Sequence, residues 1–411
     1  MKQAVIAHAN AMSAPTWHRL AVNDAEISFA RTKDPSTCAH IDMNGFHEGA
    51  SDAFEQAVDA LQARRKPAKP HDRIDGPHKG ESNDDSLDRT ALSSYQARRE
   101  RIESTGGIMA AFKTGVGEQY ASFIDEAAQR RALVADAESQ AYAVVCLEES
   151  KTSCVSALDI VVHEGANARV TVVFRGSGAD RSLPYLLGSH IRAFVGKNAR
   201  LSLTSVQAAE NGWCVVDDAG YVLDEDAVAD VKHVSLAHGE SYTGLTGDLR
   251  ADRSAMNVTT RCLARGSAHH DFNYEFAHRG RASKSDLEFN GVLAGESTKT
   301  LRATIDFVRG CKKARGHEQE SVLIAGEKAH NRSCPVILCG EDDVAGDHGS
   351  TIGHIGPEQM FYLASRGIAP DDAEAIFARG VVESALAEAD DPVARKAIES
   401  IARCPEQEEN A

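Results

Sequence analysis

A histidine near the end of the chain, His348, lies among several other residues able to bind metal. A neutral imidazole is a good ligand for divalent iron and titrates near neutral pH. Asp347 precedes it and is a candidate to orient the ring, although adjacent side chains on a strand point to opposite faces. Cys339 offers a thiolate and Glu341 a carboxylate a few residues upstream. By residue type, His348 is the primary candidate for a metal ligand in this segment, and the other three residues are secondary candidates.

Each candidate also has a purely structural interpretation. His348 fits a surface turn, Cys339 fits a packed strand residue, and Glu341 belongs to an acidic run that solvent would cover. A second group, His269, His270, Asp271 and His278, lies in "SAHHDFNYEFAH". Because alternation along a strand would separate His269 from His270, we expect this second group to form an exposed polar rung and not a metal site.

The composition restricts the class of protein. The chain has 411 residues, of which 42% are hydrophobic, and a net charge of -16, which argues against nucleic acid or an anionic membrane as the main partner. No apolar run is long enough to span a bilayer, and the N-terminus lacks the apolar region of a signal peptide, so we expect a cytoplasmic protein. The nine cysteines are scattered and predict reduced thiols without a closed zinc site.

The pattern of apolar residues changes twice along the chain. Residues 1–139 predict a helical region, with helices near 51–65 and 115–134 and a mobile polar linker around 66–90. From about residue 140, short runs rich in Val, Leu and Thr predict strands too closely spaced for helices between them. Residues 356–411 predict a C-terminal helical domain, in which Pro357 begins one helix and Gly367 ends it. The role of the polar segment 66–101 stays open.

Two internal echoes suggest how the strands are arranged. "GANARVTVV" at Gly165 returns as "GKNARLSLT" at Gly196, and "HRGRASKSDLEFNGVLAG" at His278 returns as "VRGCKKARGHEQESVLIAG" at Val308. Short strands that repeat at a fixed period favour coils stacked on one another over residues 140–355. A sandwich or a jelly roll is the alternative, and neither would need the repetition.

These segments resemble a known family. "DDVAGDHGSTIGHIGPEQMFYLASRGI" followed by "EAIFARGVVE" is similar to the C-terminal signature of the SufB/SufD family of iron–sulfur cluster assembly, and "PTWHRLAVN" resembles the N-terminal motif of SufD. Gly349 stands where SufB usually has glutamate, and Gln319 where SufB has cysteine, so the resemblance is greatest to SufD. Gly346 departs from many SufD proteins, which carry cysteine two residues before the histidine; Cys339 lies further upstream.

The resemblance implies a mainly β fold, in which a right-handed parallel β-helix core is flanked by N-terminal and C-terminal α-helical regions. It implies a scaffold without catalytic activity, on which a transient iron–sulfur cluster forms at a subunit interface near His348. The partner at the end of the β-helix would be a SufB-like subunit or a second copy of the chain. The C-terminal helices would bind the ATPase SufC, so ATP would be on that partner and no nucleotide on this chain. The partner-binding candidates are Met360, Phe361, Tyr362, Arg366, Ile376 and Phe377.

Two other functions remain as alternatives. One is a homodimeric scaffold of the same family that acts with SufC alone. The other, more remote, is a carbohydrate-active β-helix enzyme, which would need paired carboxylates and usually aromatic platforms. Aromatic residues make up only 6% of the chain, which disfavours the second alternative.

Overall fold

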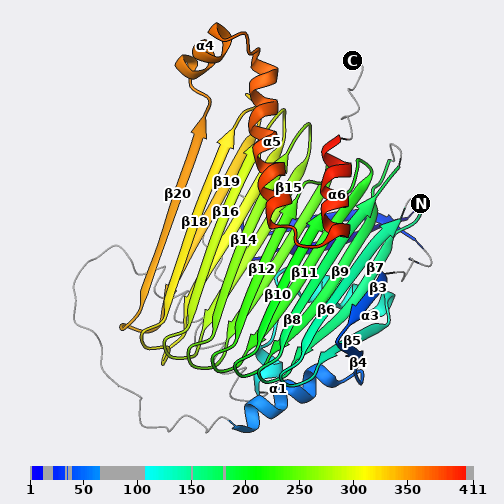
Figure 1. Ribbon diagram of the computed structural model, residues 1–411, viewed down its shortest axis with the longest axis vertical. Coiled ribbons are helices and arrows are strands. Elements are labelled where there is room, and N and C mark those ends of the chain that lie inside the picture. Colours follow the sequence, from blue (N-terminus) through cyan, green and yellow to red (C-terminus); the bar gives the residue numbers. More distant parts are fainter. Residues whose placement is uncertain are drawn as a thin grey trace.

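The computed structural model describes residues 2–12, 22–32, 35, 39–64, 107–149, 151–178 and 182–403. The polar linker predicted around 66–90 and most of the "PTWHRLAVN" motif lie outside these residues. Two long parallel sheets, stacked face to face, make up the centre of the molecule, as Figure 1 shows. The chain passes from one sheet to the other with each strand, so that successive coils form a β-solenoid. The predicted mainly β architecture of stacked parallel coils is confirmed.

The last strand of the chain's β region, β20 (Ala345–His354), forms one edge of the first sheet. The strands of this sheet, in spatial order, are β20, β18 (Arg315–Ile324), β16 (Lys284–Leu293), β14 (Ala255–Ala264), β12 (Val228–Ser235), β10 (Arg200–Gln207), β8 (Asn167–Gly176), β6 (Gln140–Glu149) and β3 (Ala39–Asn44). All pairs are parallel except β3 with β6.

The second sheet faces the first across the core. Its strands, in spatial order, are β19 (His330–Cys339), β17 (Thr298–Phe307), β15 (His269–His278), β13 (Glu240–Leu249), β11 (Trp213–Leu223), β9 (Tyr185–Val195), β7 (Cys154–Val162), β5 (Arg130–Ala135) and β4 (Phe46–Glu48). Only β4 pairs in the antiparallel direction, with β5. The solenoid strands therefore run from Arg130 to His354, close to the range expected from the sequence.

Neither sequence echo has the full register of the structure. In the second echo, the shared "VL" would place Val292 opposite Val322, but Val292 pairs with Leu323 in β16 and β18, a register that only the final "AG" of the two segments shares. In the first echo, Ala168 of β8 pairs with Leu201 of β10, two residues beyond its sequence echo Ala199. A slip of two residues keeps every side chain on its own face of the sheet, because side chains alternate with period 2. The echo therefore predicts the coils but not the pairing.

The core lies between the two sheets and is built from columns of side chains at equivalent positions in successive coils. In one column of the first sheet, Val170, Leu203, Val231, Val258 and Leu287 stack in register and are buried. Parallel strands about 4.8 Å apart bring such residues into direct contact. Burial of aliphatic side chains of this kind contributes roughly 1.5–3 kcal/mol each to folding, and the column is continuous over five coils.

The N-terminal 139 residues contain more β structure than the sequence predicts. Helices α1 (Ala53–Arg64) and α3 (Glu118–Ala127) are present, and so are β3, β4, β5 and an antiparallel hairpin of β1 (Lys2–Ala9) and β2 (Ala25–Arg31). These strands are short or pair with distant segments, which leaves little periodicity for a sequence to display. The helices and the hairpin cover the outer face of the second sheet.

A buried ion pair fastens the N-terminal segment to the solenoid. Arg302 on β17 pairs with Asp271 on β15, and its Nε donates to the main-chain oxygen of Val22 at 2.5 Å. Asn10 donates to the same Asp271 carboxylate at 2.7 Å. Arg302 and Asp271 are each 2% exposed. Buried charges need compensation, and here the two side chains neutralise one another while Asn10 and the main chain of Val22 complete their hydrogen bonds.

The C-terminal region forms helices, the last two of which, among the described residues, cover part of the outer face of the first sheet (Figure 1). The helices are α4 (Pro357–Ser365), α5 (Pro370–Glu388) and α6 (Pro392–Arg403). Gly367 ends α4 with φ +80, and the N–H of Ile368 then donates to Leu363 O at 3.0 Å, as in a Schellman motif. The C-terminal half of α5 and one face of α6 are buried against the sheet, whereas α4 has no buried residue and projects beyond the end of β20.

A second buried ion pair lies inside the solenoid near its C-terminal end. The Lys299 amine pairs with the Glu320 carboxylate, and the two residues are 0% and 1% exposed. We predict that Lys299→Met lowers the free energy of unfolding by about 3–5 kcal/mol, because it leaves the Glu320 charge buried without its cation. Urea unfolding measures the change. Lys328→Met is the matched control, because Lys328 pairs with Glu296 on the surface and should leave the midpoint unchanged. Equal midpoints for the two variants would contradict the prediction.

Candidate functional site

The last coil of the solenoid, formed by β19 and β20, has no coil stacked on it within the described residues. We call it the open coil. β20 pairs with β18 on one side only, and nearly all of its side chains are exposed. The main-chain groups on its other edge are therefore free to pair with another strand. His348 lies on β20, exposed, in register with Glu318 of β18.

His348 faces the inside of the open coil. The neighbouring inward position is marked by Ser350, whose hydroxyl donates to Glu320 Oε2 at 3.0 Å. From the opposite strand, Ser333 on β19 donates to Glu320 Oε1 at 2.8 Å. Residues two apart on a strand share a face, so His348 has the same orientation as Ser350. The imidazole thus lies over the end of the core. It occupies the same in-register column of the first sheet as Val170 and Leu203.

Two glutamates lie beneath the open coil, and their surroundings differ. Glu320 is saturated by the amine of Lys299 and by the hydroxyls of Ser333 and Ser350. Glu318 is 5% exposed, and among the described residues no donor lies within hydrogen-bond or ion-pair distance of its carboxyl group, although the charge of Lys299 acts on it from further away. Burial, and then the charge of Glu320, raises the pKa of Glu318 to about 8. Glu318 was not among the residues selected from the sequence. The feature that could have indicated it is a charged residue at an inward position of a strand.

The secondary candidates are in the same coil but point to different surroundings. The Asp347 carboxylate hydrogen-bonds the His317 ring on the outer face of the sheet, away from the inward side of His348. Glu341 Oε2 accepts a hydrogen bond at 3.0 Å from the main-chain N–H of Gly310 in the preceding turn. Cys339 ends β19, is exposed and pairs in register with Phe307, and burial raises the pKa of its thiol. Of the three, only Cys339 shares the inner side of the coil with His348.

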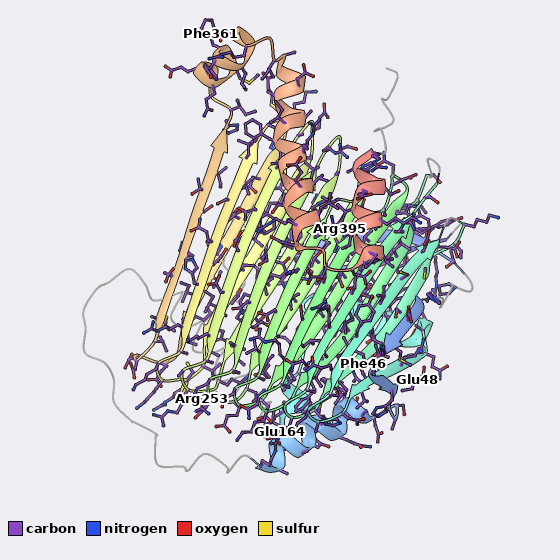
Figure 2. The ribbon with its side chains drawn as sticks, in the orientation of Figure 1. Phe46, Glu48, Glu164, Arg253, Phe361 and Arg395 are labelled. Carbon is purple, nitrogen blue, oxygen red and sulfur yellow. The ribbon has the colours of Figure 1, made fainter. Side chains whose placement is uncertain are left out.

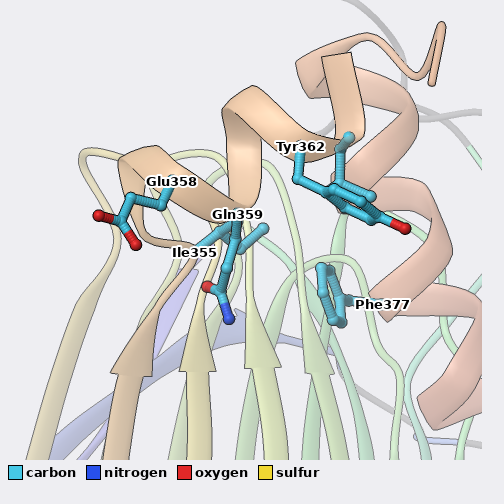
Figure 3. A pocket seen from close by; sticks show the side chains of 6 residues that line it. Ile355, Glu358, Gln359, Tyr362 and Phe377 are labelled. Atoms are coloured by element: carbon cyan, nitrogen blue, oxygen red, sulfur yellow. The ribbon is translucent and has the colours of Figure 1, made fainter. Parts of the chain in front are cut away.

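A groove lies beside the open coil, between α4 and the start of α5. It has a volume of about 360 Å³ and is lined by Ile355, Glu358, Gln359, Tyr362, Leu363 and Phe377, most of which are labelled in Figure 3. Phe361 is 77% exposed on α4, and Tyr362, Ile376 and Phe377 are also exposed. The Arg366 guanidinium lies 5.2 Å from the centre of the Tyr362 ring. Figure 2 shows Phe361 on the projecting helix, away from Arg395 on α6.

Comparison with protein families places most of this architecture in one family. The family described as SUF system FeS cluster assembly, SufBD core domain, matches residues 128–381. The chain belongs to the SufBD family. The predicted membership of the SufB/SufD family, with greatest similarity to SufD, is confirmed.

Curated relatives of this SufBD family protein are distant. It is 26% identical over 186 residues to the iron-sulfur cluster assembly protein SufD of Bacillus subtilis, a match covering 45% of this chain and 43% of that protein. It is 27% identical over 225 residues to an iron-sulfur cluster assembly SufBD family protein of Pyrococcus horikoshii, covering 55% and 43%. A chloroplastic SufBD family protein of Arabidopsis thaliana is 23% identical over 202 residues, covering 46% and 36%. The matches thus span less than half the length of these relatives.

No helix among the described residues is both long and apolar enough to cross a bilayer. The predicted partner-binding residues Met360, Phe361, Tyr362, Arg366, Ile376 and Phe377 all lie on α4, on α5 or in the turn between them. The structure therefore brings these six residues to one end of the molecule, next to the open coil.

His270, Asp271 and His278 of the second group are buried, contrary to the expectation of an exposed polar rung, and His269 is partly exposed. His270 and His278 are fully buried on β15. His270 Nε2 donates to Ala237 O at 2.9 Å, and His278 lies 2.9 Å from the hydroxyls of both Ser283 and Ser285. The solenoid interior thus accepts polar residues where each polar atom finds a partner. Burial lowers the pKa of His270 to about 4 and that of His278 to about 3.

These buried histidines predict a loss of stability in acid. Between the ordinary pKa of 6.5 and about 3, His278 takes up a proton in the unfolded chain but not in the folded chain, so stability falls as the pH falls. As the pH falls below 6.5, we expect the free energy of unfolding to decrease less steeply in His278→Asn than in the parent. The two slopes should differ by about 1.4 kcal/mol per pH unit, the contribution of one proton. Urea unfolding at pH 6.5, 5.5 and 4.5 measures both slopes. Parallel slopes would show that His278 is not held neutral.

Proposed function

We propose that this chain is a SufD-like scaffold subunit of the SUF machinery, which forms a complex with a SufB-like subunit and the ATPase SufC. A nascent iron–sulfur cluster is built in that complex and transferred from it. The chain itself performs no catalytic step in this proposal, and the cluster is cargo. The observation that carries the proposal is the open coil, with its exposed His348 and its unpaired strand edge, in a member of the SufBD family.

The unpaired edge supports a subunit interface at this end of the solenoid. A long exposed strand edge is a template for pairing, and natural proteins cover or disrupt it. β20 extends over ten residues and carries no lysine and no proline. A second protein that adds its own strand would complete the main-chain hydrogen bonds and bring its side chains next to His348.

The imidazole of His348 supports an iron site at that interface. His348 has no hydrogen-bond partner among the described residues, unlike the buried histidines of the core, so its ring nitrogens are available. Neutral imidazole binds iron without the need to displace a strong hydrogen bond.

We predict that His348→Ala lowers the iron and sulfide content of the purified complex at least tenfold and changes the free energy of unfolding by less than about 0.5 kcal/mol, since the residue is exposed. Iron and sulfide assays on the reconstituted complex measure the first effect. His354→Ala is the matched control, because His354 is also exposed on β20 and has the same inward side. Full cluster content in His348→Ala, or an equal loss in His354→Ala, would contradict the role of His348.

The groove between α4 and α5 supports the second interface, with SufC. Exposed aromatic side chains around a concave apolar surface are typical of protein–protein contact sites. Phe361 and Tyr362 are exposed on a helix that buries none of its own residues, so their exposure serves no packing inside this chain.

Tyr362 lines the groove, and Phe361 is exposed next to it on α4. We predict that the double variant Phe361→Ser and Tyr362→Ser weakens binding to SufC at least tenfold, as loss of aromatic anchors usually does. Titration calorimetry measures the affinity. Val393→Ser on α6 is the control, because Val393 is also exposed but lies away from the groove. Binding unchanged in the double variant would exclude the groove as the SufC interface.

The partner at the open coil is the point on which the two scaffold alternatives differ. The same edge fits a SufB-like subunit or a second copy of the chain. Size-exclusion chromatography of the full chain, with and without SufB, separates the two arrangements. A stable dimer that excludes SufB supports the homodimeric scaffold acting with SufC alone.

A further inference from the structure

One inward column of the first sheet changes its chemistry at the open coil. Val170, Leu203, Val231, Val258 and Leu287 occupy it in five successive coils. The next two positions in register are Glu318 and His348. A charged side chain at a position that is otherwise aliphatic needs a compensating contact, because an uncompensated buried carboxylate is costly.

The neighbouring Glu320 shows how a buried carboxylate is stabilised in this part of the solenoid. Its carboxylate accepts from Lys299, Ser333 and Ser350, so both oxygens are satisfied. Glu318 is two residues away on the same face of β18, nine-tenths or more buried, and has no such donor in the described part of the chain. The protein thus supplies three donors to one glutamate and none to its neighbour, which is the glutamate adjacent to His348.

The positions of Glu318 and His348 suit a shared metal ion. In-register residues on adjacent parallel strands lie about 4.8 Å apart, and an imidazole nitrogen and a carboxylate oxygen from such positions can both reach a metal at roughly 2.0–2.2 Å. Within the described residues, no three His, Cys, Asp or Glu side chains gather as a metal site. A two-donor site at an open edge is therefore half of a site, to be completed from outside this chain.

We propose that Glu318 is a second metal ligand beside His348, and that the two residues bind one divalent first-row transition ion, iron(II) in the cell, as this chain's part of an interface site. The inference rests on the proposed function in that iron is delivered to the open coil. Nitrogen and oxygen donors of this kind suit iron(II) and its analogue cobalt(II). Glu318 lies on the inner face with the imidazole, whereas Asp347 is held on the outer face by His317.

The test uses Co²⁺ as a probe and the full chain without partners. Equilibrium dialysis compares the parent with His348→Ala, Glu318→Gln and the control Asp347→Asn. The parent is expected to bind one Co²⁺ more per chain than His348→Ala. Glu318→Gln should weaken that site at least tenfold, whereas Asp347→Asn should match the parent. Thermal melting of each variant controls for misfolding, and Glu318→Gln should melt no lower than the parent, because it replaces a buried carboxyl group that receives no hydrogen bond.

Each outcome decides the inference. Equal Co²⁺ affinity of Glu318→Gln and the parent overturns it, as does a parent that binds no more Co²⁺ than His348→Ala, or an Asp347→Asn variant as weak as Glu318→Gln. The fate of the proposed function is read separately, from assembly with SufB and SufC and from the cluster content of the complex. If the complex forms and carries a cluster while Glu318→Gln binds Co²⁺ normally, only the role of Glu318 fails. If the Co²⁺ results hold but no complex forms, the proposed function fails.

Discussion

Each strand of the solenoid depends on the coils before and after it for its main-chain hydrogen bonds. β10, for example, pairs in register with β8 on one side and β12 on the other. A parallel strand has no tight turn to supply these bonds locally, so every coil is stable only because another lies on it. The first coil meets this requirement with the antiparallel strands β3 and β4. The last coil has no such cover among the described residues, so the two ends of the solenoid differ in whether their strand edge is paired.

The same stacking explains why polar side chains inside the solenoid are informative. Inward positions are repeated from coil to coil, so a polar residue there lies between two neighbours and cannot turn to solvent. His270, His278 and Glu320 are tolerated because hydroxyls, main-chain oxygens or the Lys299 amine satisfy them. Buried polar groups also lie in the middle coils, where Ser205 donates to Asp217 across the interior. The last two residues of the Val170 column are an acid and an imidazole.

Much of this architecture was predictable, because the alternation of strands and the repetition of coils both appear as regular patterns of apolar residues in the sequence. The echo of "GVLAG" by "SVLIAG" indicated the stacked coils of β16 and β18 to within one residue of their register, and Pro357 and Gly367 gave the limits of α4. The strands before residue 139 were missed because they are short and find their partners far along the chain, as Ile41 does opposite Val145. The burial of His278 was missed because alternation reveals which residues share a face, but not which face is the inside.

His348 was selected because its motif resembles the SufB/SufD signature, whereas no such motif pointed to Glu318. Glu318 lies thirty residues earlier in the chain and becomes a neighbour only through the pairing of β18 with β20. Asp347, adjacent in sequence, is turned away to His317 by strand alternation. The register of the last two coils therefore brings Glu318, and not Asp347, to the same face of the sheet as the ring.

Hydrogen–deuterium exchange of the main-chain amides of β20, in the free chain and in the assembled complex, tests the central claim most directly. If the open coil is the assembly interface, amides of β20 that point away from β18 should exchange rapidly in the free chain. They should then slow at least tenfold when a SufB-like subunit, or a second copy of the chain, adds its strand. Amides of β10, paired on both sides, should not change. Equal exchange of β20 in the free chain and in a saturated complex would show that assembly occurs elsewhere.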